Sequence, residues 1–151
     1  CAWLQTALGF DAVVDYKAGN LNGQLMAAAP AGIDVYFDNV GGDILEACLF
    51  RMNLGGRVAC CGAVSQYGGA PPAHGPRGVP GLIVTKRLTL QGFVLFDFAA
   101  QFDAALGVLQ GWVDGGRLKV PEDIIDGLAH TPQALIGLLA GENVGKRMVR
   151  V

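Results

Sequence analysis

Asp38 and Asn39, followed after one residue by Gly41 and Gly42, are the residues whose types and spacing most suggest chemistry. They come directly after Val35 to Phe37, a short run that favours a β-strand. In an open parallel sheet, ligands bind at the carboxyl ends of the strands, and glycines there let the backbone approach a ligand closely. The pattern by itself indicates a turn, most often an ordinary one, and makes a ligand-binding turn at Asn39 the hypothesis to examine.

Alternating helices and strands must position this turn. Helix-spaced apolar residues and short β-favouring runs follow one another, separated by Gly and Pro. The expected helices are residues 1–8, 20–29, 42–53, 79–86, 98–113 and 132–140, and the expected strands are 12–16, 34–39, 57–62, 88–96, 124–125 and 146–151. This order indicates parallel βαβ units, so the fold class is α/β with a doubly wound, mostly parallel sheet.

Two local features add to this outline. Helix 42–53 has an apolar face that includes Leu45, Cys48 and Leu49, and this places Glu46 off that face. Residues 65–81 are rich in Gly and Pro and predict a long loop, a kind of segment that often binds ligands or covers a site.

Composition narrows the class of protein. Of 151 residues, 52% are hydrophobic and only 16% are charged, which predicts a single core and favours a part of a larger protein. The net charge is −2 and the basic residues are scattered, so nucleic acid and anionic membranes are not expected partners. No apolar run approaches 18 residues, so a cytoplasmic location is expected.

Cysteine and histidine do not form a metal-binding pattern. Cys1, Cys48, Cys60 and Cys61 form no C-x-x-C pair, and the two histidines, His74 and His130, are isolated. Four-ligand zinc sites need Cys or His at ligand spacing. We therefore expect reduced thiols and no metal.

Seven ordered segments carry a resemblance to a known family: DYK at 15–17, DVYFDNVGG at 34–42, GGRVACCGAVSQY at 55–67, GPRGVP at 75–80, LTLQGFV at 88–94, GWVDGGRLK at 111–119 and GENVGKRMVRV at 141–151. Together they resemble the carboxyl-terminal half of zinc-independent medium-chain dehydrogenase/reductases. The nearest subgroup is the NADPH-dependent alkenal/alkenone double-bond reductases, which includes the leukotriene B4 dehydrogenase/prostaglandin reductases.

The resemblance implies a partial Rossmann domain over residues 1–151, ending in a closing segment. It also implies that the first two strands, their glycine fingerprint and the amino-terminal substrate domain lie outside these residues. The 151 residues alone are then expected to be inactive. Strand 12–16 would lack both neighbours, and we expect either self-association or a shifted first strand, with a homodimer as the assembly.

The resemblance also implies the residues that bind NADPH/NADP. Tyr16 and Lys17 would lie beside the 2′-phosphate, and Asn39 would hydrogen-bond the ribose side of the cofactor. The loop that would surround the nicotinamide ribose and pyrophosphate consists of Cys61, Gly62, Ala63, Val64, Ser65, Gln66 and Tyr67. Backbone groups of Phe93, Val94 and Leu95 would contact the carboxamide, and Asn143 would reach the cofactor from the last loop. The ordinary alternatives are strand, turn and packing roles.

The resemblance implies that Tyr67 is the catalytic residue. Reduction of an enal or enone needs hydride delivery to the β-carbon and stabilisation of negative charge on the carbonyl oxygen, and a phenol can donate a hydrogen bond to that oxygen. A cofactor ribose hydroxyl is the alternative donor. The alternative functions are a quinone reductase of the same superfamily and a non-catalytic nucleotide-binding or interaction protein.

Overall fold

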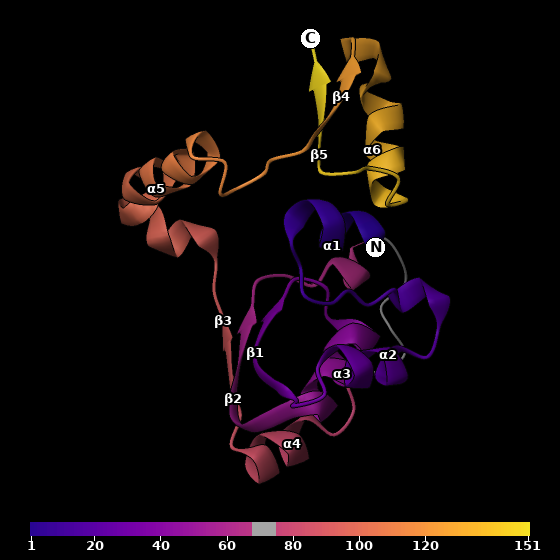
Figure 1. The fold of residues 1–151 in the computed structure, drawn as a ribbon, viewed down its shortest axis with the longest axis vertical. Helices are drawn as coiled ribbons and strands as arrows, with labels where there is room; N and C mark the ends of the chain where they lie inside the picture. Colours follow the sequence, from indigo (N-terminus) through magenta and orange to yellow (C-terminus); the bar gives the residue numbers. More distant parts are fainter. Residues whose placement is uncertain (68–74) are drawn as a thin grey trace. The chain divides into compact units, whose positions relative to one another are not determined.

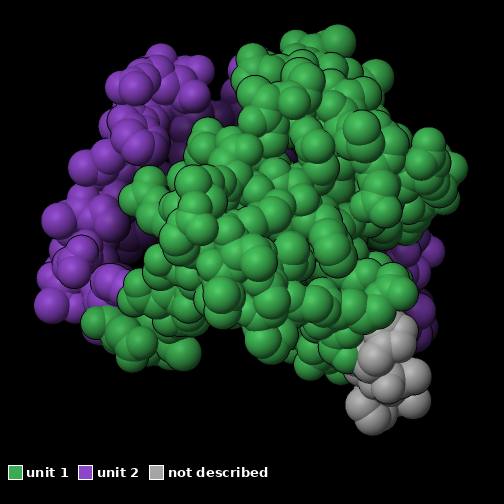
Figure 2. Space-filling view, turned by 90° about the horizontal axis from the view of Figure 1, so that it is seen from below, with its two compact units in different colours: residues 1–97 green, residues 98–151 purple. Residues whose placement is uncertain are grey.

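Residues 1–67 and 75–151 are described in a computed structural model, and they form two compact units. Unit 1 is Cys1–Asp97 and unit 2 is Phe98–Val151 (Figure 2). Part of the expected loop at 65–81, including His74, lies outside the described residues. In the described part of the chain, no helix is long and apolar enough to cross a membrane.

A three-stranded parallel sheet forms the centre of unit 1 (Figure 1). Its order is β1 (Ile33–Asp38), β2 (Met52–Cys60) and β3 (Thr89–Gly92). Phe37 pairs with Ala59, and Ala59 pairs with Gln91, so the three strands end at the same edge. This agrees with the expected α/β fold with parallel strands.

The described part of unit 1 contains four α-helices: α1 (Ala2–Leu8), α2 (Leu21–Ala28), α3 (Gly42–Arg51) and α4 (Val79–Lys86). Helix α2 packs on α3, and α4 packs on β2. The buried core joins α3, β2 and the residue just before β3 through Leu49, Met52, Val58 and Leu88. The predicted helix at 79–86 is confirmed with the same bounds.

Strand β2 begins earlier than expected. The sequence predicts a helix to residue 53 and a strand from residue 57, but α3 ends at Arg51, and Gly55 and Gly56 lie within β2. The register shifts there, since Ile33 pairs with Met52 while Val35 pairs with Arg57. Gly55 has a φ of 75°, which suits glycine and bends the strand without a steric penalty.

Unit 2 contains a helix followed by a small parallel β-pair. Helix α5 spans Phe102–Asp114, and β4 (Glu122–Asp126) pairs with β5 (Lys146–Arg150). Helix α6 (Thr131–Leu139) connects these strands and packs against β5, with Pro132 in its first turn as expected. Four 3₁₀ turns complete the described elements: η1 (Tyr16–Ala18), η2 (Val64–Gln66), η3 (Leu95–Gln101) and η4 (Leu128–His130).

The predicted strand at 12–16 is wrong. Residues 12–15 have no strand partner among the described residues, and Tyr16 begins η1. The Gln24 side chain takes the place of a neighbouring strand at Asp15. Its Oε1 accepts a bond from the Asp15 N–H at 2.8 Å, and its Nε2 donates to the Asp15 carbonyl at 2.8 Å. A strand needs a hydrogen-bonded ladder, and here a glutamine satisfies the backbone instead.

The predicted strand at 88–96 is too long. Ladder pairing ends at Gly92, and the chain enters η3 at Leu95. An apolar run does not by itself distinguish a strand from a helical turn, because both can bury apolar side chains.

Candidate functional site

Asp38 ties together the carboxyl ends of β1 and β2. It is only 2% exposed, and its Oδ1 accepts bonds from the Tyr36 hydroxyl at 2.9 Å, the Val40 N–H at 3.1 Å and the Gly41 N–H at 3.0 Å. Its backbone carbonyl accepts a bond from the Cys61 N–H at 2.7 Å. The turn after β1 is thereby held against the end of β2.

Asn39, Gly62 and Tyr67 lie together at this edge. A Cβ placed on Gly62 would overlap Asn39 Oδ1 and would lie 3.4 Å from the Tyr67 hydroxyl oxygen. Asn39 and Tyr67 are exposed, and no described residue hydrogen-bonds the Asn39 side chain. The structure therefore brings together the Asn39 amide, after β1, and the Tyr67 phenol, in the loop after β2. Their roles in binding and catalysis remain predictions.

The segment Cys61–Tyr67 packs against the turn after β1 through its backbone. Val64 N donates to the Asn39 carbonyl at 3.1 Å, and Ser65 donates to the Val40 carbonyl from both its N–H, at 3.1 Å, and its hydroxyl, at 2.6 Å. The N–H groups of Cys61, Gly62, Gln66 and Tyr67 are also bonded within the fold. Among the described residues, none accepts a bond from the Ala63 N–H. A ligand at this loop can therefore use the Ala63 N–H, carbonyl groups and side chains.

Two glycines at the start of α3 have no side chain that would keep a ligand away from the backbone. Gly41 and Gly42 have φ of 72° and 56°, values that favour glycine. Ser65 Oγ lies 3.1 Å from the position of a Gly42 Cβ, so a side chain there would press on the loop after β2. The first N–H groups of α3 have no partner within the helix and carry partial positive charge, which suits an anionic or polar ligand group.

Phe93 extends the edge beyond β3. Its ring lies 6.1 Å from that of Phe37, centroid to centroid, and its N–H donates to the Cys60 carbonyl at 3.2 Å. The Val94 N–H is 3.4 Å from Asp97 Oδ2. The predicted backbone contacts of Phe93, Val94 and Leu95 to a carboxamide remain a prediction, and the Phe93 N–H is already engaged within the fold.

The described contacts of Tyr16, Lys17 and Asn143 are with residues close to them in the sequence. Tyr16 and Lys17 form η1, where Lys17 Nζ lies 6.0 Å from the Tyr16 ring centroid and Asp15 caps the turn. Asn143 belongs to unit 2, and its Nδ2 donates to the Gly145 carbonyl at 2.7 Å. The contacts of these residues are therefore local, and their roles remain predictions.

Buried thiols and a phenol surround Asp38. Burial raises the pKa of Tyr36, and Cys48 and Asp38 beside it add to the shift. Burial also raises the pKa of the Cys48 and Cys60 thiols, with a further contribution from the Asp38 charge. These groups stay protonated at neutral pH, so their thiols are not activated nucleophiles. Among the described residues, no group of three His, Cys, Asp or Glu side chains is placed to hold a metal ion.

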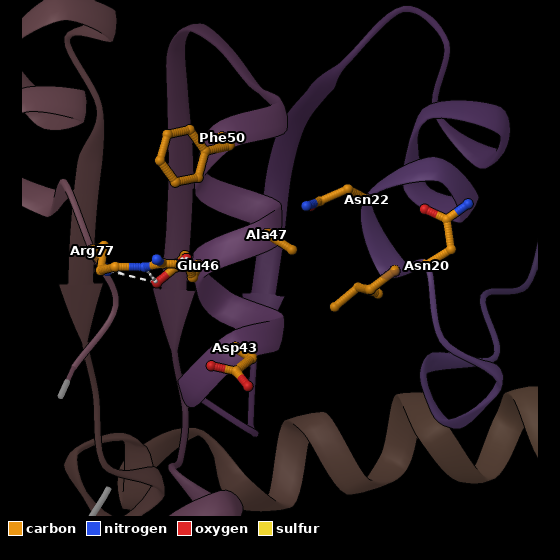
Figure 3. Close-up of a pocket in the computed structure, with 8 residues that line it drawn as sticks. Asn20, Asn22, Asp43, Glu46, Ala47, Phe50 and Arg77 are labelled. Atoms are coloured by element: carbon orange, nitrogen blue, oxygen red, sulfur yellow. Dashed lines mark hydrogen bonds and ion pairs between the residues drawn. The ribbon is translucent and has the colours of Figure 1, made fainter. Parts of the chain in front are cut away.

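A separate pocket of about 680 Å³ lies over α3 (Figure 3). Asn20 and Asn22 line it from the start of α2, and Asp43 and Phe50 line it from α3. Figure 3 shows Glu46 of α3 turned towards Arg77, and Arg77 Nη2 is 2.6 Å from Glu46 Oε1. Glu46 lies off the apolar face of α3, as expected, since it lines the pocket with Asp43 and Phe50 while Leu49 is in the core. It is nevertheless buried, and the ion pair with Arg77 satisfies its carboxylate.

No functional contact is predicted from the sequence for Tyr36, Asp38 or Glu46. Asp38 had a local signal, since an Asp two or three residues before backbone N–H groups of a turn often accepts their hydrogen bonds. Tyr36 alternates with Asp38 along the strand and therefore points to the same face. Glu46 had no local signal, because its partner Arg77 is 31 residues away.

The chain is similar to known dehydrogenases and reductases. A family model described as "Zinc-binding dehydrogenase" matches residues 2–111. Prostaglandin reductase 1 of Bos taurus is 41% identical over 151 residues, which cover 99% of this chain and 45% of that protein. NADPH-dependent curcumin reductase of Escherichia coli is 38% identical over 155 residues, which cover 100% of this chain and 45% of that protein.

A solved structure has the same fold. CurA from Vibrio vulnificus in complex with NADPH superposes with a TM-score of 0.92 at 34% identity, covering 100% of this chain and 46% of that chain. The chain thus spans less than half the length of these relatives.

Proposed function

The chain belongs to the zinc-binding dehydrogenase family, and on that premise we propose that it carries the NADP(H)-binding part of an oxidoreductase. The reaction proposed is reduction of the carbon–carbon double bond of α,β-unsaturated aldehydes and ketones. One observation carries the proposal: the Asn39 amide and the Tyr67 hydroxyl both lie next to Gly62 at the carboxyl edge of a parallel sheet. The names of the prostaglandin and curcumin reductases support the reaction class.

The residues at this edge fit a dinucleotide. A Cβ at Gly62 would fill the space between Asn39 and Tyr67, so a small residue keeps that space available to a ligand. The Asn39 side-chain amide and the Ala63 N–H form no hydrogen bond with any described residue, so both can bond to a ligand. We propose that NADP(H) is held by Asn39, by the segment Cys61, Gly62, Ala63, Val64, Ser65, Gln66 and Tyr67, and by Phe93, Val94 and Leu95. Tyr16, Lys17 and Asn143 are further proposed contacts.

Tyr67 is the proposed catalytic residue. Bound NADPH would supply the hydride that the reaction needs. As the double bond is reduced, negative charge develops on the carbonyl oxygen of the substrate, and the exposed Tyr67 hydroxyl would donate a hydrogen bond to that oxygen. The β1–α3 turn would hold the cofactor, while the loop after β2 presents the phenol.

Substitution of Tyr67 by Phe in the full-length protein tests this role. We expect enone reduction to fall by about 10²-fold, because one donor to the developing charge is lost. The dissociation constant for NADPH should stay within about twofold, since the ring remains in place. Unchanged turnover would remove Tyr67 from the mechanism and leave a cofactor ribose hydroxyl as the donor.

Assays of the unsubstituted protein separate the competing functions. Turnover of quinones in place of enones would favour a quinone reductase, and NADPH binding without turnover of either would favour a non-catalytic nucleotide-binding protein. We expect the 151 residues alone to bind weakly and not to turn over. Enone reduction by these residues alone would contradict that expectation.

A homodimer is the proposed assembly. Strand β1 is an edge strand among the described residues, and its Val35 and Phe37 are each 60% exposed, a surface that favours association. Sedimentation of a monomer at micromolar concentration would contradict the proposal. The cytoplasmic location stays a prediction.

A further inference from the structure

Asp38 accepts hydrogen bonds from three segments of the chain. The Tyr36 hydroxyl and the N–H groups of Val40 and Gly41 all bond to Oδ1. The Asp38 carbonyl accepts the N–H groups of Cys61 at 2.7 Å and Gly62 at 3.3 Å. The donors that bond to this carboxylate are all neutral, and each donor lost leaves an acceptor with fewer hydrogen bonds in the buried region.

These bonds fix the backbone on both sides of Asn39. Asp38 precedes it and is buried, while Val40 follows it and is bonded through its N–H to Asp38 and through its carbonyl to Ser65. The Asn39 carbonyl accepts the Val64 N–H. With its backbone held in this way, the Asn39 side chain is left exposed and faces Gly62.

We propose that Tyr36 and Asp38 are positioning residues for NADP(H): the Tyr36 hydroxyl holds the Asp38 carboxylate, and that carboxylate sets the Asn39 amide and the Gly41 turn in the orientation that binds the cofactor. The inference rests on the proposed function of the edge. Neither residue contacts the ligand, because Asp38 is 2% exposed and Tyr36 lies half-buried beneath the turn.

The role of Asp38 depends on an acceptor oxygen rather than on charge. All three bonds to its side chain end on Oδ1, so an asparagine could keep them through its own carbonyl oxygen. An alanine would leave the Val40 and Gly41 N–H groups without their acceptor. The Tyr36 hydroxyl acts through one bond to Oδ1, and phenylalanine would remove that bond while keeping the ring.

Three substitutions in the full-length protein test the inference: Tyr36→Phe, Asp38→Asn and Asp38→Ala. NADPH affinity is measured by titration, and KM for the enone is measured at saturating NADPH. Loss of one to two hydrogen bonds predicts that the dissociation constant for NADPH rises about three- to tenfold in Tyr36→Phe and about tenfold or more in Asp38→Ala. Asp38→Asn should stay within about twofold. KM for the enone should not change.

Asp34→Ala is the matched control. Asp34 lies on the same strand, and its carboxylate accepts a bond from Asn53 Nδ2 at 2.9 Å, at the end of β1 far from the edge. The affinity of the Asp34→Ala variant for NADPH should equal that of the unsubstituted protein. If Asp38→Ala does not fold, Tyr36→Phe and Asp38→Asn still decide the question.

Each outcome bears on one claim. An unchanged dissociation constant in folded Tyr36→Phe, or a loss in Asp38→Asn as large as in Asp38→Ala, would overturn the inference. A fall in thermal stability without any change in NADPH affinity would assign the pair a structural role only and would overturn it as well. If the unsubstituted protein does not bind NADPH, that result would instead contradict the proposed function.

Discussion

Gly62 lies against Asn39 so closely that a Cβ at position 62 would overlap Oδ1 of the Asn39 side chain. The two residues follow different strands, β2 and β1, and meet only because the strands run parallel and end at one edge. The same Cβ would also approach the Tyr67 hydroxyl. The size of residue 62 therefore controls the separation of the amide and the phenol at the proposed site.

Gly62→Ala should weaken NADPH binding. The added methyl group would push the Asn39 side chain away from its position, and we expect the dissociation constant to rise by about tenfold, the equivalent of one good hydrogen bond. Gly92→Ala is the control at the end of β3, because nothing lies within 4 Å of its Cβ position. Equal affinities of the two variants would contradict this account.

The free energy of unfolding should fall at alkaline pH. Burial raises the pKa of Tyr36, Cys48 and Cys60 in the folded chain. Their contribution is complete below the pKa values of the unfolded chain, about 8.5 for the thiols and about 10 for tyrosine, and is lost as the pH rises towards the folded values. Urea unfolding at about pH 7 and about pH 10.5 measures the loss, which Tyr36→Phe should reduce. An equal loss of unfolding free energy in the unsubstituted protein and in Tyr36→Phe would contradict a contribution from Tyr36.

Arg147 should contribute more to stability than Arg150. Both residues oppose an aspartate across β4 and β5, Arg147 facing Asp123 at 2.9 Å and Arg150 facing Asp126 at 2.6 Å. The Arg147 side chain is 11% exposed, while that of Arg150 is 65% exposed. Removing one partner of a largely buried pair leaves a charge in the interior, so Arg147→Gln should cost about 3 kcal/mol.

The control for that change is Arg150→Gln. Solvent screens its pair with Asp126, and the substitution should not measurably alter the free energy of unfolding. Chemical denaturation of both variants provides the comparison. A larger loss in Arg150→Gln than in Arg147→Gln would show that burial does not set the contribution of these pairs.

Gly145 should tolerate alanine less well than Gly9. Both have positive φ, 83° and 74°, so alanine at either position incurs a conformational cost of about 1 kcal/mol. A Cβ at Gly145 would also overlap the carbonyl oxygen of Pro121, whereas nothing lies within 4 Å of that position at Gly9. Thermal unfolding should therefore show a loss of about 3 kcal/mol or more for Gly145→Ala. Similar losses at the two sites would mean that unit 2 adjusts around Pro121.

Much of the fold follows from local sequence pattern. The helix at Val79–Lys86 and the strand beginning at Lys146 are confirmed because apolar periodicity and glycine or proline at their ends act within a few residues. The meeting of Asn39 with the loop after β2 could also be predicted, since parallel strands place their carboxyl ends at one edge. The cofactor contacts of Tyr16, Lys17 and Asn143 stay predictions.

The sequence by itself determined the alternation of helices and strands from residue 20 onwards, the parallel pairing of the strands and the position of Asn39 at the carboxyl end of β1. Only the tertiary structure decided that residues 12–15 form no strand, that Glu46 is buried against Arg77, and that Asp38 holds the turn. Each of these depends on a partner chosen by the fold: a neighbouring backbone, a guanidinium 31 residues away, or a tyrosine on the same buried face. Local periodicity contains no information about such partners, because a hydrogen bond or ion pair forms only where folding brings its two groups together.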